Sequence, residues 1–232
     1  AVVAYKKNGY KVFTSVNAFG GTSAWDNYPD SRPVKADGSF LDKKGHGGVC
    51  PSHPQYRKDR LIHITELVKD TPNIDGIWLD FIRYPGYWET ENPKIPDTCY
   101  CQRCLNLFQE QTNVQIPKEV KPAQWIYNNA LYKWMIWKKL QINSFVQEVR
   151  ETLDQNRQVN KLTLGLFLVP WTKGERENAI SYQLGQDPFA LSKIADVISP
   201  MVYHRMTKNP LSWVGEMTAY YNETSESQVW PI

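Results

Sequence analysis

Four cysteines are the residues of this sequence whose spacing most directly indicates chemistry. Three of them fall within the run C-Y-C-Q-R-C, and the fourth lies earlier in the chain. Three thiolates so close in sequence can reach one ion with the loop wrapped around it, and a fourth thiolate completes a tetrahedral site. The spacing therefore predicts a structural zinc site, with no coordination position open for catalysis, formed by Cys50, Cys99, Cys101 and Cys104.

Other uses of the cysteines stay open at this stage. Two disulfides would also consume all four, although a bond between Cys99 and Cys101 would close a strained ring. A mixed site in which Cys50 joins His46 or His53 is a further alternative, as are free thiols. The density of cysteines over residues 99–104 favours the metal.

A single carboxylate, Asp80, is the strongest candidate for catalysis. It stands near the end of an almost continuously apolar run, within D-G-I-W-L-D-F-I-R-Y-P (residues 75–85). Alternation along a strand places Asp80 on the inner face and puts three apolar residues on the face toward the helices: Ile77, Leu79 and Phe81. A buried carboxylate must be hydrogen-bonded, paired or functional. We interpret Asp80 as catalytic; the alternative is a structural ion pair with Arg83, which would hold it ionised.

Polar and aromatic residues at the ends of the predicted strands are weaker candidates for substrate contacts. Each has a structural alternative: asparagine can satisfy loop backbone, histidine can be merely packed or solvated, and tryptophan can be plain packing. The expected substrate-binding residues are Asn17, Arg83, Tyr84, Trp171, Tyr203 and His204. Nothing in the spacing of Trp88, Glu89 and Glu91 singles them out. The sequence has no Ser-His-Asp signal, no H-E-x-x-H and no zinc-deaminase motif.

Alternating helices and strands must position these residues. Apolar, β-prone runs predict strands over residues 10–19, 74–82, 162–169, 195–203 and 228–232. Helical periodicity and capping signals predict helices over residues 1–7, 54–70, 125–155, 187–194 and 211–221. Residues 20–54 and 83–124 are expected to form long loops. Strict alternation of helix and strand predicts a parallel sheet.

Such a sheet can be open or closed into a barrel. An open nucleotide-binding sheet carries a glycine-rich turn after a strand, and Gly20-Gly21 fits neither G-x-G-x-x-G nor the P-loop pattern. The candidate residues instead follow several different strands, as they do in a (β/α)8 barrel. We therefore predict an α/β fold with a parallel (β/α)8 TIM barrel; an open doubly wound α/β sheet is the alternative.

Composition excludes several classes of protein. The chain has 232 residues, 41% of them apolar, which suffices for one sizeable core. A net charge of +3 with no basic run disfavours nucleic acid as a partner, and no apolar stretch is long enough for a membrane helix. We expect neither a nucleic acid nor a membrane partner. The 9 Trp, 13 Tyr and 8 Phe exclude low-complexity disorder and fit an aromatic core or a sugar-binding groove.

Two stretches resemble barrel glycoside hydrolases. W-L-D-F-I-R-Y-P resembles the fourth-strand signature L-D-x-x-R-Y-P of glycosyl-hydrolase-like barrel proteins. H-G-G-V-C-P-S-H-P-Q-Y-R (46–57), followed by C-Y-C-Q-R-C-L-N-L-F (99–108), is similar to the structural zinc layout of family 42 β-galactosidases. The resemblance covers residues 10–110. Beyond residue 110, only the order of the strands is similar. It implies strands three to seven, so we expect residues 1–232 to be a single barrel catalytic domain that is incomplete at both ends.

The resemblance breaks at the catalytic position. Family 42 enzymes carry an Asn-Glu pair at the end of the strand that here reads Leu79-Asp80-Phe81, so their mechanism and galactoside specificity do not carry over. Enzymes of the broader group pair two carboxylates, the second commonly from the seventh strand. The resemblance implies that Asp80 is the acid/base or the nucleophile, with its partner carboxylate expected after Ile232.

Together these observations predict hydrolysis of O-glycosidic bonds of a poly- or oligosaccharide by paired carboxylates, with structural zinc and no organic cofactor. A non-catalytic carbohydrate-binding barrel is the alternative, because no second carboxylate is evident. A zinc module for nucleic acid or protein contacts is third, and the mild net charge argues against it. The expected partner is a carbohydrate; the sugar, the linkage, the stereochemical outcome and the oligomeric state are not predicted. The compartment stays open, with a secreted or periplasmic location favoured over a cytoplasmic one.

Overall fold

A parallel sheet forms the centre of the computed structural model, which describes residues 2–43, 47–156 and 161–232. Each strand pairs with the next one along the chain. This order is that of a (β/α) barrel and lacks the reversal of an open doubly wound sheet. The predicted α/β barrel class is confirmed, with five strands in the described residues: β1 (Phe13–Asn17), β2 (Gly76–Asp80), β3 (Thr163–Leu168), β4 (Val197–Pro200) and β5 (Gln228–Val229).

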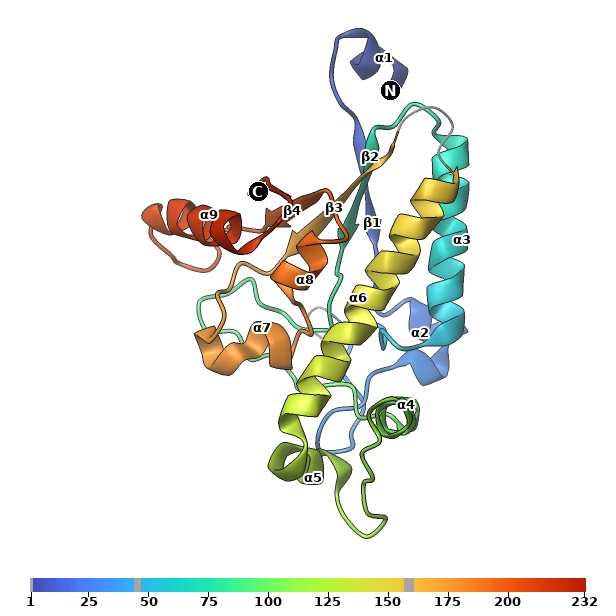
Figure 1. Cartoon of the computed structure of the whole chain (residues 1–232), viewed down its shortest axis with the longest axis vertical. Coiled ribbons are helices and arrows are strands. Elements are labelled where there is room, and N and C mark those ends of the chain that lie inside the picture. Colours follow the sequence, from blue (N-terminus) through green and yellow to red (C-terminus); the bar gives the residue numbers. More distant parts are fainter. Residues whose placement is uncertain (1, 44–46, 157–160) are drawn as a thin grey trace.

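Helices of very different lengths join the strands. The long ones are α3 (Pro54–Asp70), α4 (Gln102–Thr112), α5 (Pro122–Asn129), α6 (Leu131–Asn156) and α9 (Ser212–Thr224). The short ones are α1 (Val2–Lys7), α2 (Ala24–Asn27), α7 (Ala179–Tyr182) and α8 (Pro188–Ser192), with the 3-10 segments η1 (Pro29–Ser31) and η2 (Glu175–Asn178). Helices α3 and α6 pack side by side along the sheet, and α4 and α5 lie at the end of the molecule opposite α1 (Figure 1).

The face of the sheet toward α3 and α6 carries the main core. Ile77 and Leu79 of β2 are fully buried, and they belong to one cluster with Ile64 of α3 and Phe145 of α6. Burial of each such side chain contributes about 1.5–3 kcal/mol. The predicted alternation of β2 is therefore confirmed on this face.

The inner face of the sheet is filled by aromatic rings at its amino end. Trp78 stacks on Trp230 with ring centroids 5.6 Å apart, and its Nε1 donates a hydrogen bond to Ser199 Oγ at 2.9 Å. A glycine is required opposite this ring, because a Cβ at Gly165 would lie 2.1 Å from the indole. Trp78, two residues before Asp80, thus fills part of the inner face of the sheet.

Several elements differ from the prediction, among them α2 and η1, which lie in the expected loop over residues 20–54. Helix α4 lies within residues 83–124, which were expected to be a loop, and it buries Cys104, Leu105 and Phe108. The predicted helix over residues 125–155 is two helices, because Ala130 has φ −144° and ψ 18° and ends α5. Most other predicted elements form within a few residues of their expected bounds, including α8, whose capping residue Asp187 accepts a hydrogen bond from the Ala190 amide.

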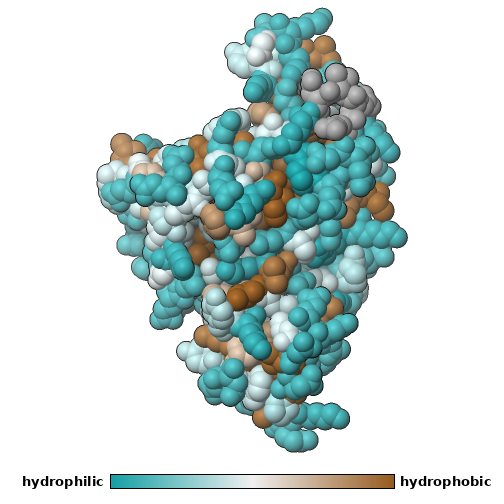
Figure 2. Space-filling model, viewed as in Figure 1, coloured by the Kyte–Doolittle hydropathy of each residue, from teal (hydrophilic) through white to brown (hydrophobic). Residues whose placement is uncertain are grey.

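The face in Figure 2 is mainly hydrophilic, and its apolar side chains lie in small groups. In the part of the chain that the structure describes, no helix combines the length and apolar character that crossing a membrane requires.

Candidate functional site

Two polar side chains end neighbouring strands at the same level. Asn17 of β1 and Asp80 of β2 are register partners, and the Ala18 amide donates to the Asp80 carbonyl at 2.8 Å. Asn17 Oδ1 accepts a hydrogen bond from the Gly20 amide at 2.7 Å. This bond satisfies a backbone group of the loop, which was the structural alternative to substrate binding for this residue. Both residues stand where a parallel barrel builds its active site.

A sharp turn follows Asp80. Phe81 has φ 51°, in the left-handed region that non-glycine residues rarely adopt, and its amide donates to Asp80 Oδ1 at 2.7 Å. The Phe81 ring lies against Gly20, where a Cβ would come within 2.4 Å of it. The prediction that Phe81 continues the helix-facing row of β2 is therefore wrong, because the strand ends at Asp80.

Arg83 lies buried beside this turn with only 2% of its surface exposed. Its Nε and Nη1 have no hydrogen-bond partner among the described residues, and its guanidinium lies 4.6 Å from the centre of the Phe81 ring. Burial lowers the pKa of Arg83, and the negative charges of Glu89 and then Asp80 oppose that shift. The charges are neighbours, but these two nitrogens do not form the hydrogen-bonded pair with Asp80 that the structural alternative requires.

Tyr203, after β4, completes the group. Burial raises the pKa of Tyr203, the negative charges of Asp80 and Glu89 raise it further, and Arg83 opposes them. Its ring stacks on Trp88 with centroids 5.6 Å apart. We call Asp80, Arg83, Glu89 and Tyr203 the carboxylate cluster.

Glu89 was missed by the sequence analysis. It is half-buried, and its Oε2 accepts the Trp88 amide at 3.2 Å. The sequence did contain a signal for Glu89. In a barrel, the loop after each strand lies at the face that carries the site, and Glu89 is the first acidic residue after Asp80.

Three other predicted substrate contacts do not belong to the carboxylate cluster. Tyr84 has no exposed surface, and its ring faces the Lys138 ammonium at 4.4 Å, so its assignment as a substrate contact is corrected to a core role. Trp171 is 3% exposed, with the Arg176 guanidinium 5.2 Å from its ring, which fits packing better than a sugar platform. His204 is half-buried directly after Tyr203, at the same end of the sheet.

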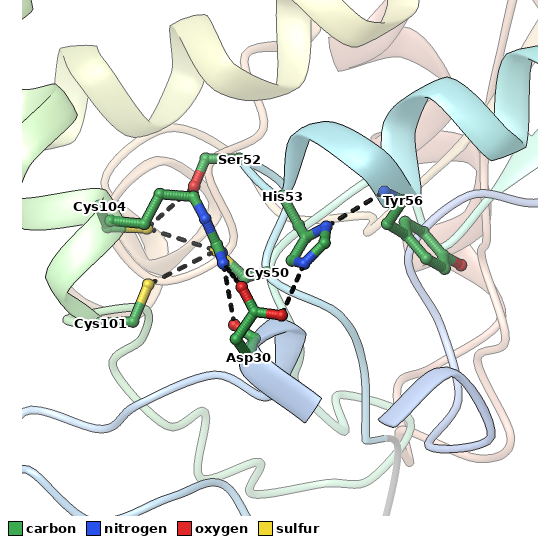
Figure 3. Close-up of polar contacts among 8 residues, drawn as sticks. Asp30, Cys50, Ser52, His53, Tyr56, Cys101 and Cys104 are labelled. Atoms are coloured by element: carbon green, nitrogen blue, oxygen red, sulfur yellow. Dashed lines mark hydrogen bonds and ion pairs between the residues drawn. The ribbon is translucent and has the colours of Figure 1, made fainter. Parts of the chain in front are cut away.

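The four predicted metal ligands do come together. Their Sγ atoms all lie within 4.8 Å of one another, and Cys50, Cys99 and Cys104 are fully buried. Cys50 Sγ lies 3.3 Å from Cys104 Sγ and 4.0 Å from Cys101 Sγ (Figure 3). All four are free, so the two disulfides considered above are not formed. The four cysteines can hold one metal ion.

Hydrogen-bonding groups surround the sulfur atoms. The Val34 amide donates to Cys99 Sγ at 3.3 Å, and Ser52 Oγ lies 3.2 Å from Cys50 Sγ and 3.1 Å from Cys104 Sγ. Hydrogen bonds from the other three cysteines, Cys104 first, lower the pKa of Cys101. Burial raises the pKa of Cys104. Hydrogen bonds within the cluster thus favour the thiolate of Cys101, whereas burial disfavours ionisation of Cys99 and Cys104.

The mixed site with His53 is excluded by the contacts of that ring. His53 Nδ1 accepts the Tyr56 amide at 3.1 Å and so caps α3, and Nε2 lies 3.0 Å from Asp30 Oδ1 (Figure 3). Asp30 also pairs with Arg103, and its hydrogen bond with His53 lowers the pKa of Asp30. These contacts tie η1, α3 and α4 together around the cysteines. His46, the other histidine considered, lies outside the described residues.

Comparisons with solved structures identify the fold. The glycoside hydrolase domain of PgaB (BpsB) from Bordetella bronchiseptica superposes with a TM-score of 0.69 at 13% identity, over 95% of this chain and 59% of that one. A GH42 β-galactosidase from G. stearothermophilus gives 0.57 at 16% identity, over 88% and 32%. The catalytic domain of a β-amylase from Paenibacillus polymyxa gives 0.56 at 11% identity, over 100% and 78%.

The fold is that of a glycoside hydrolase-like barrel. The chain spans between 30% and 59% of the length of the β-galactosidases and of the PgaB domain that it matches. No protein-family model matches the sequence, and a search of curated proteins found no match.

Proposed function

We propose that this chain carries the site of a glycoside hydrolase that cleaves O-glycosidic bonds of a poly- or oligosaccharide, with Asp80 and Glu89 as the paired carboxylates. The observation that carries the proposal is the position of Asp80 at the carboxyl end of β2, in register with Asn17 at the end of β1. The negative charges of Asp80 and Glu89 both act on the buried guanidinium of Arg83. The glycoside hydrolase fold of the neighbouring structures supports it.

The proposed chemistry divides two tasks between the carboxyl groups. One carboxylic acid gives its proton to the leaving oxygen as the C–O bond breaks, and the other carboxylate attacks the anomeric carbon or removes a proton from the attacking water. In this proposal Asn17 and Tyr203 donate hydrogen bonds to sugar hydroxyls. A carboxylate after Ile232 remains the alternative partner for Asp80.

Turnover by the wild-type chain and by Asp80→Asn tests this proposal. Aryl glycosides and polysaccharides are offered, and released phenol or reducing ends are measured. We expect Asp80→Asn to lower turnover by at least about 100-fold, because an acid/base or nucleophilic group is lost, at nearly unchanged melting temperature. Equal turnover by both proteins contradicts the role of Asp80. Calorimetric binding of a glycan without hydrolysis favours the carbohydrate-binding barrel.

We also propose that Cys50, Cys99, Cys101 and Cys104 bind one structural Zn²⁺. A tetrahedral ion with Zn–S bonds of about 2.3 Å requires sulfur atoms about 3.8 Å apart. The distances of 3.3 and 4.0 Å from Cys50 to Cys104 and Cys101 bracket that value. Four thiolates leave no position for substrate, so the metal would fix the loops and not react. Elemental analysis should find one zinc per chain in the purified protein and none in Cys104→Ser.

A further inference from the structure

Ser52 has a buried hydroxyl that lies between two cysteine sulfurs. Its Oγ is 3.1 Å from Cys104 Sγ and 3.2 Å from Cys50 Sγ (Figure 3), and the residue is only 5% exposed. These two sulfurs, from segments far apart in the sequence, are its hydrogen-bond partners in the part of the chain that the structure describes. Buried hydroxyl groups are placed where a partner satisfies them. The position of Ser52 is therefore explained by the four cysteines.

A tight turn holds Ser52 in this position. The Cys50 amide donates to the Ser31 carbonyl at 2.8 Å, and the His53 amide donates to the Cys50 carbonyl at 3.0 Å. Ser52 thus stands in the middle of a turn that is closed by a hydrogen bond between its ends. His53, directly after it, caps α3 through its side chain. The backbone is fixed on both sides of Ser52, which orients the hydroxyl toward the sulfurs.

The direction of these hydrogen bonds depends on whether the cysteines hold a metal. A thiol can donate as well as accept, whereas a thiolate bound to Zn²⁺ has no proton and can only accept. With the metal bound, Ser52 must therefore be the donor, and its one proton goes to either of two sulfurs at nearly equal distance. The Val34 amide also donates to Cys99 Sγ at 3.3 Å, but no side-chain substitution removes that bond.

We propose that Ser52 is an outer hydrogen-bond donor of the metal site, a residue that stabilises the metal-loaded thiolates by donating to Cys50 or Cys104. A hydrogen bond to an ionised acceptor is roughly twice as strong as one between neutral groups, so this bond favours the loaded site over the metal-free thiols. The inference rests on the zinc site proposed above. It adds to that site a positioning residue that is not a ligand.

The test measures Zn²⁺ affinity of the whole chain by competition with a chromophoric chelator. Ser52→Ala removes only the hydroxyl, and we expect affinity to fall at least about tenfold, as for other residues that support metal ligands. Ser31→Ala is the matched control. Ser31 is also buried, its carbonyl accepts the Cys50 amide, and its hydroxyl has no hydrogen-bond partner among the described residues. Because no bond is lost, this variant should change affinity less than about twofold.

The absorption spectrum of the Co²⁺-loaded protein separates the hydrogen bond from packing. A sulfur ligand that loses its donor has more electron density, so the sulfur-to-cobalt charge-transfer band should move to longer wavelength in saturated Ser52→Ala. The band should stay in place in Ser31→Ala. Both variants should keep the visible bands of a tetrahedral tetrathiolate site.

Three results would overturn the inference: wild-type Zn²⁺ affinity in Ser52→Ala, a loss of affinity without movement of the charge-transfer band, or an equal loss in Ser31→Ala. The last two would assign the effect to packing around the turn. A wild-type chain that binds no Zn²⁺ instead overturns the zinc site itself.

Discussion

Trp88 stacks on Tyr203 with ring centroids 5.6 Å apart and planes inclined by 19°, so the loop that leaves β2 lies against the end of β4. Trp88 has no exposed surface, and such ring pairs contribute about 0.5–1.5 kcal/mol beyond area burial. The contact holds Glu89, the next residue, close enough to act electrostatically on Arg83. Packing between two loops therefore assembles the carboxylate cluster.

Glu89→Gln should abolish most of the hydrolytic activity. If Glu89 is one of the paired carboxylates, its amide can neither transfer a proton nor attack, and kcat/KM should fall at least about 100-fold. The matched control is Glu91→Gln, two residues on, whose Oε2 pairs with exposed Lys208 at 2.7 Å. An exposed ion pair contributes about 0–1 kcal/mol, so this variant should keep wild-type kinetics and melting temperature. Equal activity of the two variants would assign the second carboxylate to another part of the protein.

Gly165→Ala should destabilise the barrel. A methyl group there would lie 2.1 Å from the Trp78 indole, which is held by Ser199 and stacked on Trp230. Overpacking of this kind costs about 1–3 kcal/mol. Gly215→Ala in α9 is the control; its Cβ meets nothing within 4 Å, and helix propensity predicts a gain of about 0.5–1 kcal/mol. Urea unfolding measures both changes, and equal midpoints for the two variants would contradict this packing.

Alkaline pH should destabilise the protein through Tyr221. Burial raises the pKa of this fully buried phenol, whose hydroxyl donates to the Val169 carbonyl at 2.7 Å. The folded pKa lies above the unfolded value of 10.0, so the stabilisation is complete below pH 10 and is lost as pH rises and the unfolded state ionises. Tyr221→Phe should cost about 1 kcal/mol at neutral pH through the lost hydrogen bond. Above pH 10 the free energy of unfolding of the variant should fall with pH less steeply than that of the wild type. The two slopes should differ by about 1.36 kcal/mol per pH unit. Parallel pH profiles of both proteins would refute this assignment.

Local patterns were enough to predict the strand order and the grouping of the four cysteines. Strands buried on both faces of a parallel sheet have almost continuously apolar sequences. Asp80 could be selected as a candidate because it ends one of these sequences. Cys99, Cys101 and Cys104 lie on one short loop and helix start, so spacing alone brought them together, and Cys50 was the one cysteine left to join them.

The remaining site residues depend on contacts between distant segments. Glu89 is placed by the stacking of Trp88 on Tyr203. This contact leaves no local pattern in the sequence. Helix α4 was not predicted for a different reason: its apolar stripe is short, and its one cysteine, Cys104, was interpreted only as a metal ligand.

Removal of the metal should loosen the cysteine loops before it affects the sheet. If Zn²⁺ binds the folded chain only, a free concentration of about 100 times its Kd stabilises the fold by about 2.7 kcal/mol. For a domain of this size that corresponds to about 5–10 °C in melting temperature. We expect a strong chelator to lower the wild-type melting temperature by that amount, and added Zn²⁺ to restore it. Cys104→Ser, which removes a fully buried ligand, should melt low and respond to neither treatment. A wild-type melting temperature that ignores the chelator, in protein shown by elemental analysis to have lost its metal, would contradict a structural role for the ion.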